Sequence, residues 1–195
     1  MHVDRQAPRI GGDGVSDGLD MGVSTMDRAL DVLSRLKGPV VPLNVCFNED
    51  GSVDYPSVRK YADWLCEQGV PVLLLTYGSS EYPGLSDDEI WRLTEEVTVA
   101  VAGRCLFITS TGWWKPSVCR QFLRHADRAG ADAVKVQINV WMPKTREVLL
   151  GYFDQVQDAC EIPLLAWAHT PPPFPVEVAA ELAARPNVVG IKNDG

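Results

Sequence analysis

Apolar residues in this chain follow two alternating patterns. Short runs rich in Val, Ile and Leu carry almost no charge, which is typical of parallel strands covered on both faces. Between the runs, apolar residues recur every three or four positions, which predicts amphipathic helices. The predicted strands cover residues 39–45, 70–77, 105–110, 133–139, 163–168 and 188–192.

Capping residues and glycines mark the ends of the predicted helices. Asp54 precedes one helical stretch and Gly69 follows it, as N-cap aspartates and C-terminal glycines do. The run Ser-Asp-Asp-Glu at residues 86–89 is a capping-box pattern in front of another. The predicted helices cover residues 24–36, 54–68, 86–102, 116–130, 145–160 and 175–184.

Strands and helices therefore alternate at spacings of about 25 to 35 residues, which indicates parallel βα units and an α/β fold. Two architectures fit, a doubly wound open sheet and a (β/α)8 TIM barrel. The glycine-rich signatures of nucleotide-binding open sheets do not occur in the sequence. A barrel would gather the polar residues that follow the strands on one face: Ser79, Ser80, Ser110, Thr111, Asn139, His169 and Lys192.

The length and the net charge of the chain limit its domain organisation, its possible partners and its location. The 195 residues suit one domain, with residues 1–23, rich in Gly and Asp and without periodicity, as a disordered tail and residues 24–195 as a partial barrel domain. A net charge of −8 argues against nucleic acid or an anionic membrane as a partner. No apolar run is long enough to span a membrane and no apolar signal core is present, so we expect a cytoplasmic protein.

The five cysteines are odd in number and widely spaced, with no C-x-x-C pair. This pattern indicates neither a zinc site nor a disulfide framework. We expect reduced, mostly buried thiols, no metal and no bound cofactor.

The last predicted strand, residues 188–192, ends on a lysine. Strand alternation puts Val188, Gly190 and Lys192 on one face, so the lysine has apolar neighbours and room beside it. Desolvation favours the neutral amine, the form that attacks a carbonyl group. The alternative is a strand-end lysine whose ammonium group reaches into water.

Five short motifs occur in a fixed order along the chain. Together they resemble the dihydrodipicolinate synthase/N-acetylneuraminate lyase family over about residues 36–195, in a divergent and C-terminally truncated form. The motifs are Gly38-Pro39-Val40-Val41-Pro42 with Phe47 and Asp50-Gly51, then Gly78-Ser79-Ser80-Glu81, Leu85-Ser86-Asp87-Asp88-Glu89, Gly130-Ala131-Asp132 and Gly190-Ile191-Lys192. Members of that family are (β/α)8 barrels, usually tetramers.

The resemblance implies an activity. Family members form a Schiff base between a strand-six lysine and pyruvate or a related 2-oxo acid, and then make or break a carbon–carbon bond or dehydrate a sugar acid. By resemblance Lys192 is that lysine, and Ser79 and Ser80 match the turn that holds the keto-acid carboxylate, with Ser79 also in the proton relay. Without the family context, both serines are ordinary turn residues.

The chain departs from the family pattern at several of these places. The turn at residues 78–81 is one residue shorter, and Trp167 replaces the strand-five tyrosine that moves protons. Indole donates one hydrogen bond and has no accessible acid–base chemistry. The arginine of the synthases falls near Pro172, and the aromatic pair after strand four becomes Val140-Trp141.

Two further residues bear on this chemistry, and His169 is the candidate for the missing relay. His169 has an acid–base range that suits proton transfer, and shares the strand parity of Trp167 if the strand extends that far. The alternative is a loop histidine. Lys135 lies on the polar side of its strand, where it would point into the barrel and repel the charge of Lys192, act as a rival amine, or form an ion pair at the barrel floor.

Four of the six tryptophans follow the ends of strands three, four and five: Trp113, Trp114, Trp141 and Trp167. On a barrel they would line an aromatic pocket for an aryl or bulky substrate, with Trp141 and Trp167 as substrate-binding residues. The alternative is that most of them pack under loops or at a subunit interface.

We therefore expect a Schiff-base lyase or aldolase that acts on a small 2-oxo acid and is a homo-oligomer at full length. Two other hypotheses are a non-catalytic relative that binds a metabolite or a partner, and an unrelated βα barrel with a structural lysine. About six of the eight βα units are predicted, so the chain is expected to be a fragment or part of an assembly, and unstable alone.

Overall fold

The structure, a computed structural model, describes residues 24–139, 141–168 and 174–192. The predicted tail lies outside this range. The strands are β1 (Val40–Pro42), β2 (Val72–Leu74), β3 (Leu106–Ser110), β4 (Ala133–Ile138), β5 (Leu164–Ala168) and β6 (Val188–Lys192). The helices are α1 (Thr25–Arg35), α2 (Tyr55–Glu67), η1 (Tyr82–Gly84), α3 (Asp87–Val101), α4 (Pro116–Ala129), α5 (Arg146–Val156) and α6 (Val176–Ala183).

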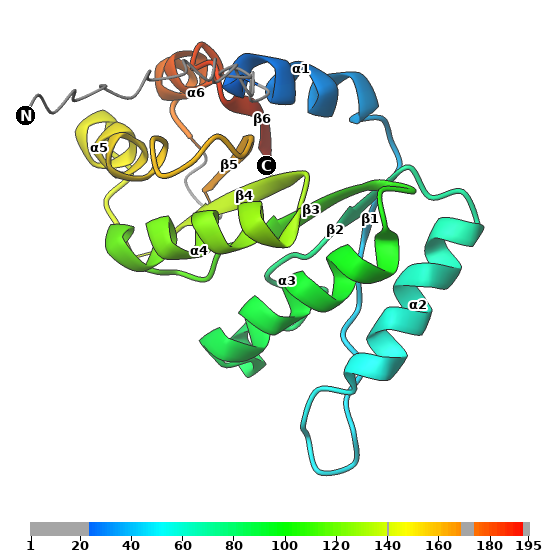
Figure 1. The fold of residues 1–195 in the computed structure, drawn as a ribbon. Coiled ribbons are helices and arrows are strands. Elements are labelled where there is room, and N and C mark those ends of the chain that lie inside the picture. The colour runs from blue at the N-terminus through cyan, green and yellow to red at the C-terminus, as the bar shows by residue number, and fades with distance from the viewer. Residues whose placement is uncertain (1–23, 140, 169–173, 193–195) are drawn as a thin grey trace, which may run out of the picture.

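Within the described ranges, six strands form one parallel sheet whose spatial order, β1 to β6, is also their order along the chain. Helices α2, α3, α4 and α5 follow one another around the outside of the curled sheet (Figure 1). A doubly wound sheet would change direction at a switch point and carry helices on both faces. The prediction of a partial (β/α)8 barrel, with six βα units, is confirmed.

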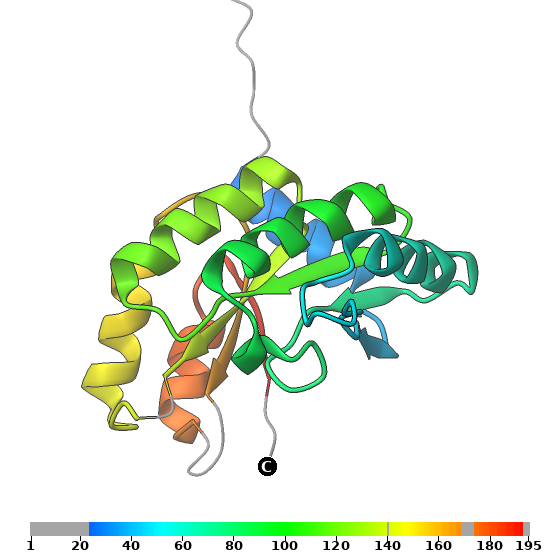
Figure 2. The same cartoon turned by 90° about the horizontal axis from the view of Figure 1, so that it is seen from below.

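Strand alternation divides the core into two clusters. On the outer face, residues such as Leu73, Phe107 and Val134 pack with apolar residues of α2 to α6. On the inner face, residues such as Leu74, Ile108 and Leu165 pack with Ala29 and Val32 of α1. Helix α1 therefore covers part of the inner face, and it lies beside β6, apart from the row of α2 to α4 (Figures 1 and 2).

The predicted caps begin the helices as expected. Asp54 accepts a hydrogen bond from the Ser57 amide at the start of α2, and Thr145 accepts one from Val148 at the start of α5. Ser86 and Glu89 form the complete capping box of α3.

Strands β1 and β2 are shorter than the predicted ranges 39–45 and 70–77. Strand β2 ends at Leu74, although apolar residues continue to Leu75. The backbone amide of Thr76 donates to Ser80 Oγ, and the Ser80 amide donates to the Thr76 carbonyl group. These two bonds turn the chain away from the sheet, so the run of apolar residues extends beyond the last residue of β2.

None of the helices in the described part of the chain has the length and apolar character needed to cross a membrane.

Candidate active site

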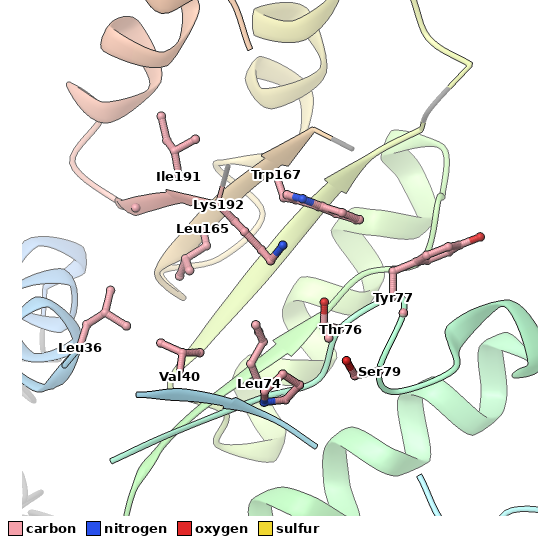
Figure 3. Close-up of a pocket in the computed structure, with 13 residues that line it drawn as sticks. Leu36, Val40, Leu74, Thr76, Tyr77, Ser79, Leu165, Trp167, Ile191 and Lys192 are labelled. Carbon is pink, nitrogen blue, oxygen red and sulfur yellow. The ribbon is translucent and has the colours of Figure 1, made fainter. Parts of the chain in front are cut away.

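A cavity of about 620 Å³ opens on the inner face of the sheet, where the ends of β2, β5 and β6 face one another (Figure 3). Its apolar wall is formed by residues at the end of α1, on β1 and β2, and on β5 and β6: Leu36, Val40, Pro42, Leu74, Leu165 and Ile191. Its polar and aromatic side is formed by Thr76, Tyr77, Ser79, Trp167 and Lys192. An apolar pocket with few polar groups is typical of small-molecule sites.

Lys192 is the last residue of β6 and points into this cavity (Figure 3). It pairs in register with Trp167 of β5, and its Nζ lies 5.1 Å from the centre of the Trp167 ring. Below it on the same strand, Gly190 also lines the cavity, and a side chain there would contact Leu165. The small residue keeps space open beside the amine.

Lys135 is a second lysine close to the same indole. It is fully buried in β4, and its Nζ lies 4.2 Å from the centre of the Trp167 ring. Its Nζ donates a hydrogen bond of 2.8 Å to Thr76 Oγ1. The structure thus places Lys135 on the inner face, where its hydrogen bond connects it to Thr76, a residue that lines the cavity.

The two predicted serines occupy different places in the turn after β2. Ser79 is exposed and lines the cavity. Ser80 is fully buried; its hydroxyl group donates to the Leu43 carbonyl group at 2.6 Å and accepts from the Thr76 amide at 2.9 Å. Ser80 therefore holds the turn against the end of β1, while Ser79 faces the space where a substrate would lie.

The other predicted site residues are placed as follows. Trp167 is 3% exposed and lines the cavity, whereas the side chain of Trp141 is 84% exposed and does not. His169 lies outside the described residues, as do Val140 and Pro172. The structure thus brings Lys192, Trp167 and Ser79 together and leaves Trp141 apart.

Two cavity residues were missed at the sequence level, Thr76 and Tyr77. Tyr77 stacks on Trp113, with ring centres 4.2 Å apart, and lies 6.5 Å from the ring centre of Trp167. Thr76 is a hydroxyl residue at the end of an otherwise apolar run, and it shares strand parity with Leu74 on the inner face. That parity was the signal that could have found it.

The remaining tryptophans named above lie at a second cavity of about 550 Å³, between the start of α4 and α5. Trp113 and Trp114 both line it. Trp114 also packs edge-on against Phe122, and its Nε1 donates to Asp87. The four tryptophans are therefore divided between two cavities and the surface.

Among residues 24–139, 141–168 and 174–192, no group of three or more His, Cys, Asp or Glu side chains is arranged to hold a metal ion. The thiols of Cys105 and Cys119 are buried, and burial raises the pKa of each to about 12. Both cysteines therefore behave as structural thiols.

The model of the dihydrodipicolinate synthetase family matches residues 35–194 of the chain. The chain belongs to this family. The resemblance expected from the five motifs is thereby confirmed.

Curated proteins with similar sequences support membership of the dihydrodipicolinate synthetase family. The 4-hydroxy-tetrahydrodipicolinate synthase of Methylobacterium radiotolerans is 32% identical over 164 residues, which cover 82% of this chain and 54% of the relative. That of Gluconacetobacter diazotrophicus is 29% identical over 163 residues, which cover 82% of this chain and 55% of the relative. The chain thus spans about half the length of the curated relatives that it matches.

Solved structures share the fold. Dihydrodipicolinate synthase from Oceanobacillus iheyensis superposes with a TM-score of 0.78 at 21% identity, over 86% of this chain and 55% of that chain. YagE, a prophage protein of the dihydrodipicolinic acid synthase family from E. coli K12, was solved in complex with pyruvate. It superposes with a TM-score of 0.74 at 26% identity, over 82% of this chain and 56% of that chain.

Proposed function

We propose that this protein is a Schiff-base-forming lyase or aldolase that acts on pyruvate or a related 2-oxo acid. The observation that carries the proposal is the position of Lys192, at the end of β6 and inside an apolar cavity of about 620 Å³. Family membership and the pyruvate complex of the prophage protein support it.

The cavity suits the first step of such a reaction. The neutral amine of Lys192 attacks the carbonyl carbon of the 2-oxo acid, and loss of water gives an iminium group that stabilises negative charge on the neighbouring carbon. The apolar wall, including Leu74 and Leu165, limits water around the amine. The Ser79 hydroxyl group, at the opposite side of the cavity, is our candidate to bind the substrate carboxylate.

Trp167 takes the place of an acid–base residue in this scheme and acts as a wall. Its indole packs against both lysines and cannot exchange protons near neutral pH. His169 stays a predicted proton-transfer residue, and Ser80 and Trp141 stay predicted substrate-binding residues. We also propose that the full-length protein is a homo-oligomer in the cytoplasm.

Reductive trapping tests this function. Incubation with pyruvate and borohydride is expected to add one reduced pyruvate group to each chain, because borohydride reduces the iminium bond to a stable amine. Lys192→Ala is expected to abolish the adduct, as seen in the intact mass. Lys60→Ala, which removes an exposed lysine of α2, is the control and is expected to retain it.

The second candidate is a non-catalytic relative that binds a metabolite or a partner. It is favoured by one observation, the buried indole of Trp167 at the position where the family carries a proton-transferring tyrosine. Pyruvate binding measured by calorimetry, together with the absence of any adduct in the wild-type protein, would support this candidate and refute the first.

A further inference from the structure

The hydrogen bond between Lys135 and Thr76 joins a fully buried amine to the wall of the cavity. Lys135 Nζ lies 2.8 Å from Thr76 Oγ1, and Thr76 lines the cavity together with Lys192. Burying an amine in the sheet interior is costly, and an apolar residue in its place would avoid that cost. The position of Lys135 therefore calls for a reason beyond packing.

The register of the strands shows how the amine reaches Thr76. Lys135 pairs with Ser110 of β3 and with Leu165 of β5. The neighbouring hydroxyl group, that of Ser110, donates to the Leu75 carbonyl group. Thr76 is thus the hydroxyl that connects Lys135 to the cavity.

The direction of this bond is from Lys135 Nζ to Thr76 Oγ1. The Thr76 hydroxyl group therefore accepts, and its own proton has to point elsewhere. Figure 3 shows the Thr76 oxygen on the side of the cavity toward Lys192 and Trp167. Thr76 can therefore offer a hydrogen-bond donor to a molecule bound at Lys192, while Lys135 holds a proton behind it.

We propose that Thr76 and Lys135 form a proton relay for the chemistry at Lys192, in which Thr76 exchanges protons with the bound 2-oxo acid and Lys135 is the positioning residue behind it. This inference rests on the proposed Schiff-base function. It assigns proton transfer, which Trp167 cannot perform, to Lys135 on β4 and to Thr76 in the turn after β2.

The relay returns its proton within one cycle. When the carbinolamine loses its hydroxyl group, Thr76 gives that group its proton and takes one from the Lys135 ammonium group; water leaves and the iminium bond forms. The iminium compound then loses a proton from C3 to Thr76 Oγ1, Thr76 passes its hydroxyl proton to the Lys135 amine, and the enamine forms. Lys135 ends as it began, as an ammonium group.

Two measurements separate the relay from the Schiff base itself. Borohydride trapping reports whether the iminium bond forms, and NMR in D2O reports the exchange of the C3 protons of pyruvate, which requires the enamine. Lys135→Met keeps a side chain of similar length but removes the amine, and Thr76→Val keeps the shape but removes the hydroxyl group. Positioned acid–base groups contribute about 100-fold or more, so each variant is expected to slow exchange by about 100-fold.

Trapping in both variants is expected to reach the wild-type level at long incubation. Thr76→Ser, which keeps the hydroxyl group, is expected to retain exchange within a few-fold, and a purely structural role of the hydroxyl would not predict that rescue. Lys144→Met, a partly buried lysine outside the first cavity, is the matched control for loss of a lysine and is expected to exchange normally.

Each outcome is decisive. Exchange at the wild-type rate in Thr76→Val or in a folded Lys135→Met would overturn the relay while the Schiff-base function stands. No adduct in the wild-type protein would overturn the proposed function and the relay with it. If Lys135→Met does not fold, Thr76→Val decides alone.

Discussion

At the scale of single residues, three buried or half-buried polar groups define the site: Lys192, Lys135 and Ser80. Lys192 ends β6 and Lys135 lies within β4, and strand alternation directs both to the inner face, whereas Ser80 lies in the turn after β2. Their roles differ because their contacts differ. Lys192 lines the cavity beside Trp167, Lys135 donates to a hydroxyl group, and Ser80 bonds to backbone groups.

Ser80→Ala is expected to destabilise the protein. The substitution leaves the Leu43 carbonyl group and the Thr76 amide, both buried, without their partner. The expected cost is about 1–3 kcal/mol in the free energy of unfolding, measured in urea. Ser79→Ala is the matched control, and since Ser79 is exposed, its free energy of unfolding should change by less than about 0.5 kcal/mol. Equal effects would contradict the assignment.

At the scale of elements, the helices and strands were largely predictable, because their signals are local. Asp54, Ser86 and Thr145 cap helices as the sequence indicates. The length of β2 was not predictable, since it depends on Ser80 reaching back to Thr76. Hydrophobic periodicity records which residues are buried, and it does not record which backbone amides stay in the sheet.

The N-cap of α2 is expected to make stability depend on pH. Hydrogen bonds from the Ser57 hydroxyl and amide groups lower the pKa of Asp54 below its usual 3.8. A lowered folded-state pKa gives stabilisation that is complete above the unfolded value and is lost as the pH falls through the folded value. Below about pH 4, the wild-type protein should therefore lose stability more steeply than Asp54→Asn, whose amide still caps the helix. Parallel curves of unfolding free energy against pH would refute this.

At the scale of the whole molecule, the curled sheet places residues from β2, β5 and β6 around one cavity. The sequence indicated the barrel, Lys192, Ser79 and Trp167, because motifs and strand ends carry that information. It did not indicate that Trp141 lies on the surface or that Tyr77 and Thr76 line the cavity. These placements depend on the conformations of the loops that follow the strands, and the residue type at one position does not predict a loop conformation.

The aromatic side of the cavity leads to a prediction about substrates. Tyr77 and Trp167 line it, and Trp113 stacks behind Tyr77. An aryl group would pack against these rings and displace water from them. We expect 2-oxo acids with an aryl group to be turned over with a higher kcat/KM than hydrophilic sugar-acid analogues. Equal values for the two classes would count against an aromatic binding site, and Trp64→Ala, at an exposed tryptophan of α2 that does not line the cavity, is expected to leave the ratio unchanged.

The most direct test of the central claim is to locate the reduced pyruvate adduct by tandem mass spectrometry of the trapped protein. The proposed function predicts the added mass on Lys192, in the peptide that contains β6, and an unmodified Lys135. An adduct on Lys135, or no adduct on either lysine at saturating pyruvate, would contradict it.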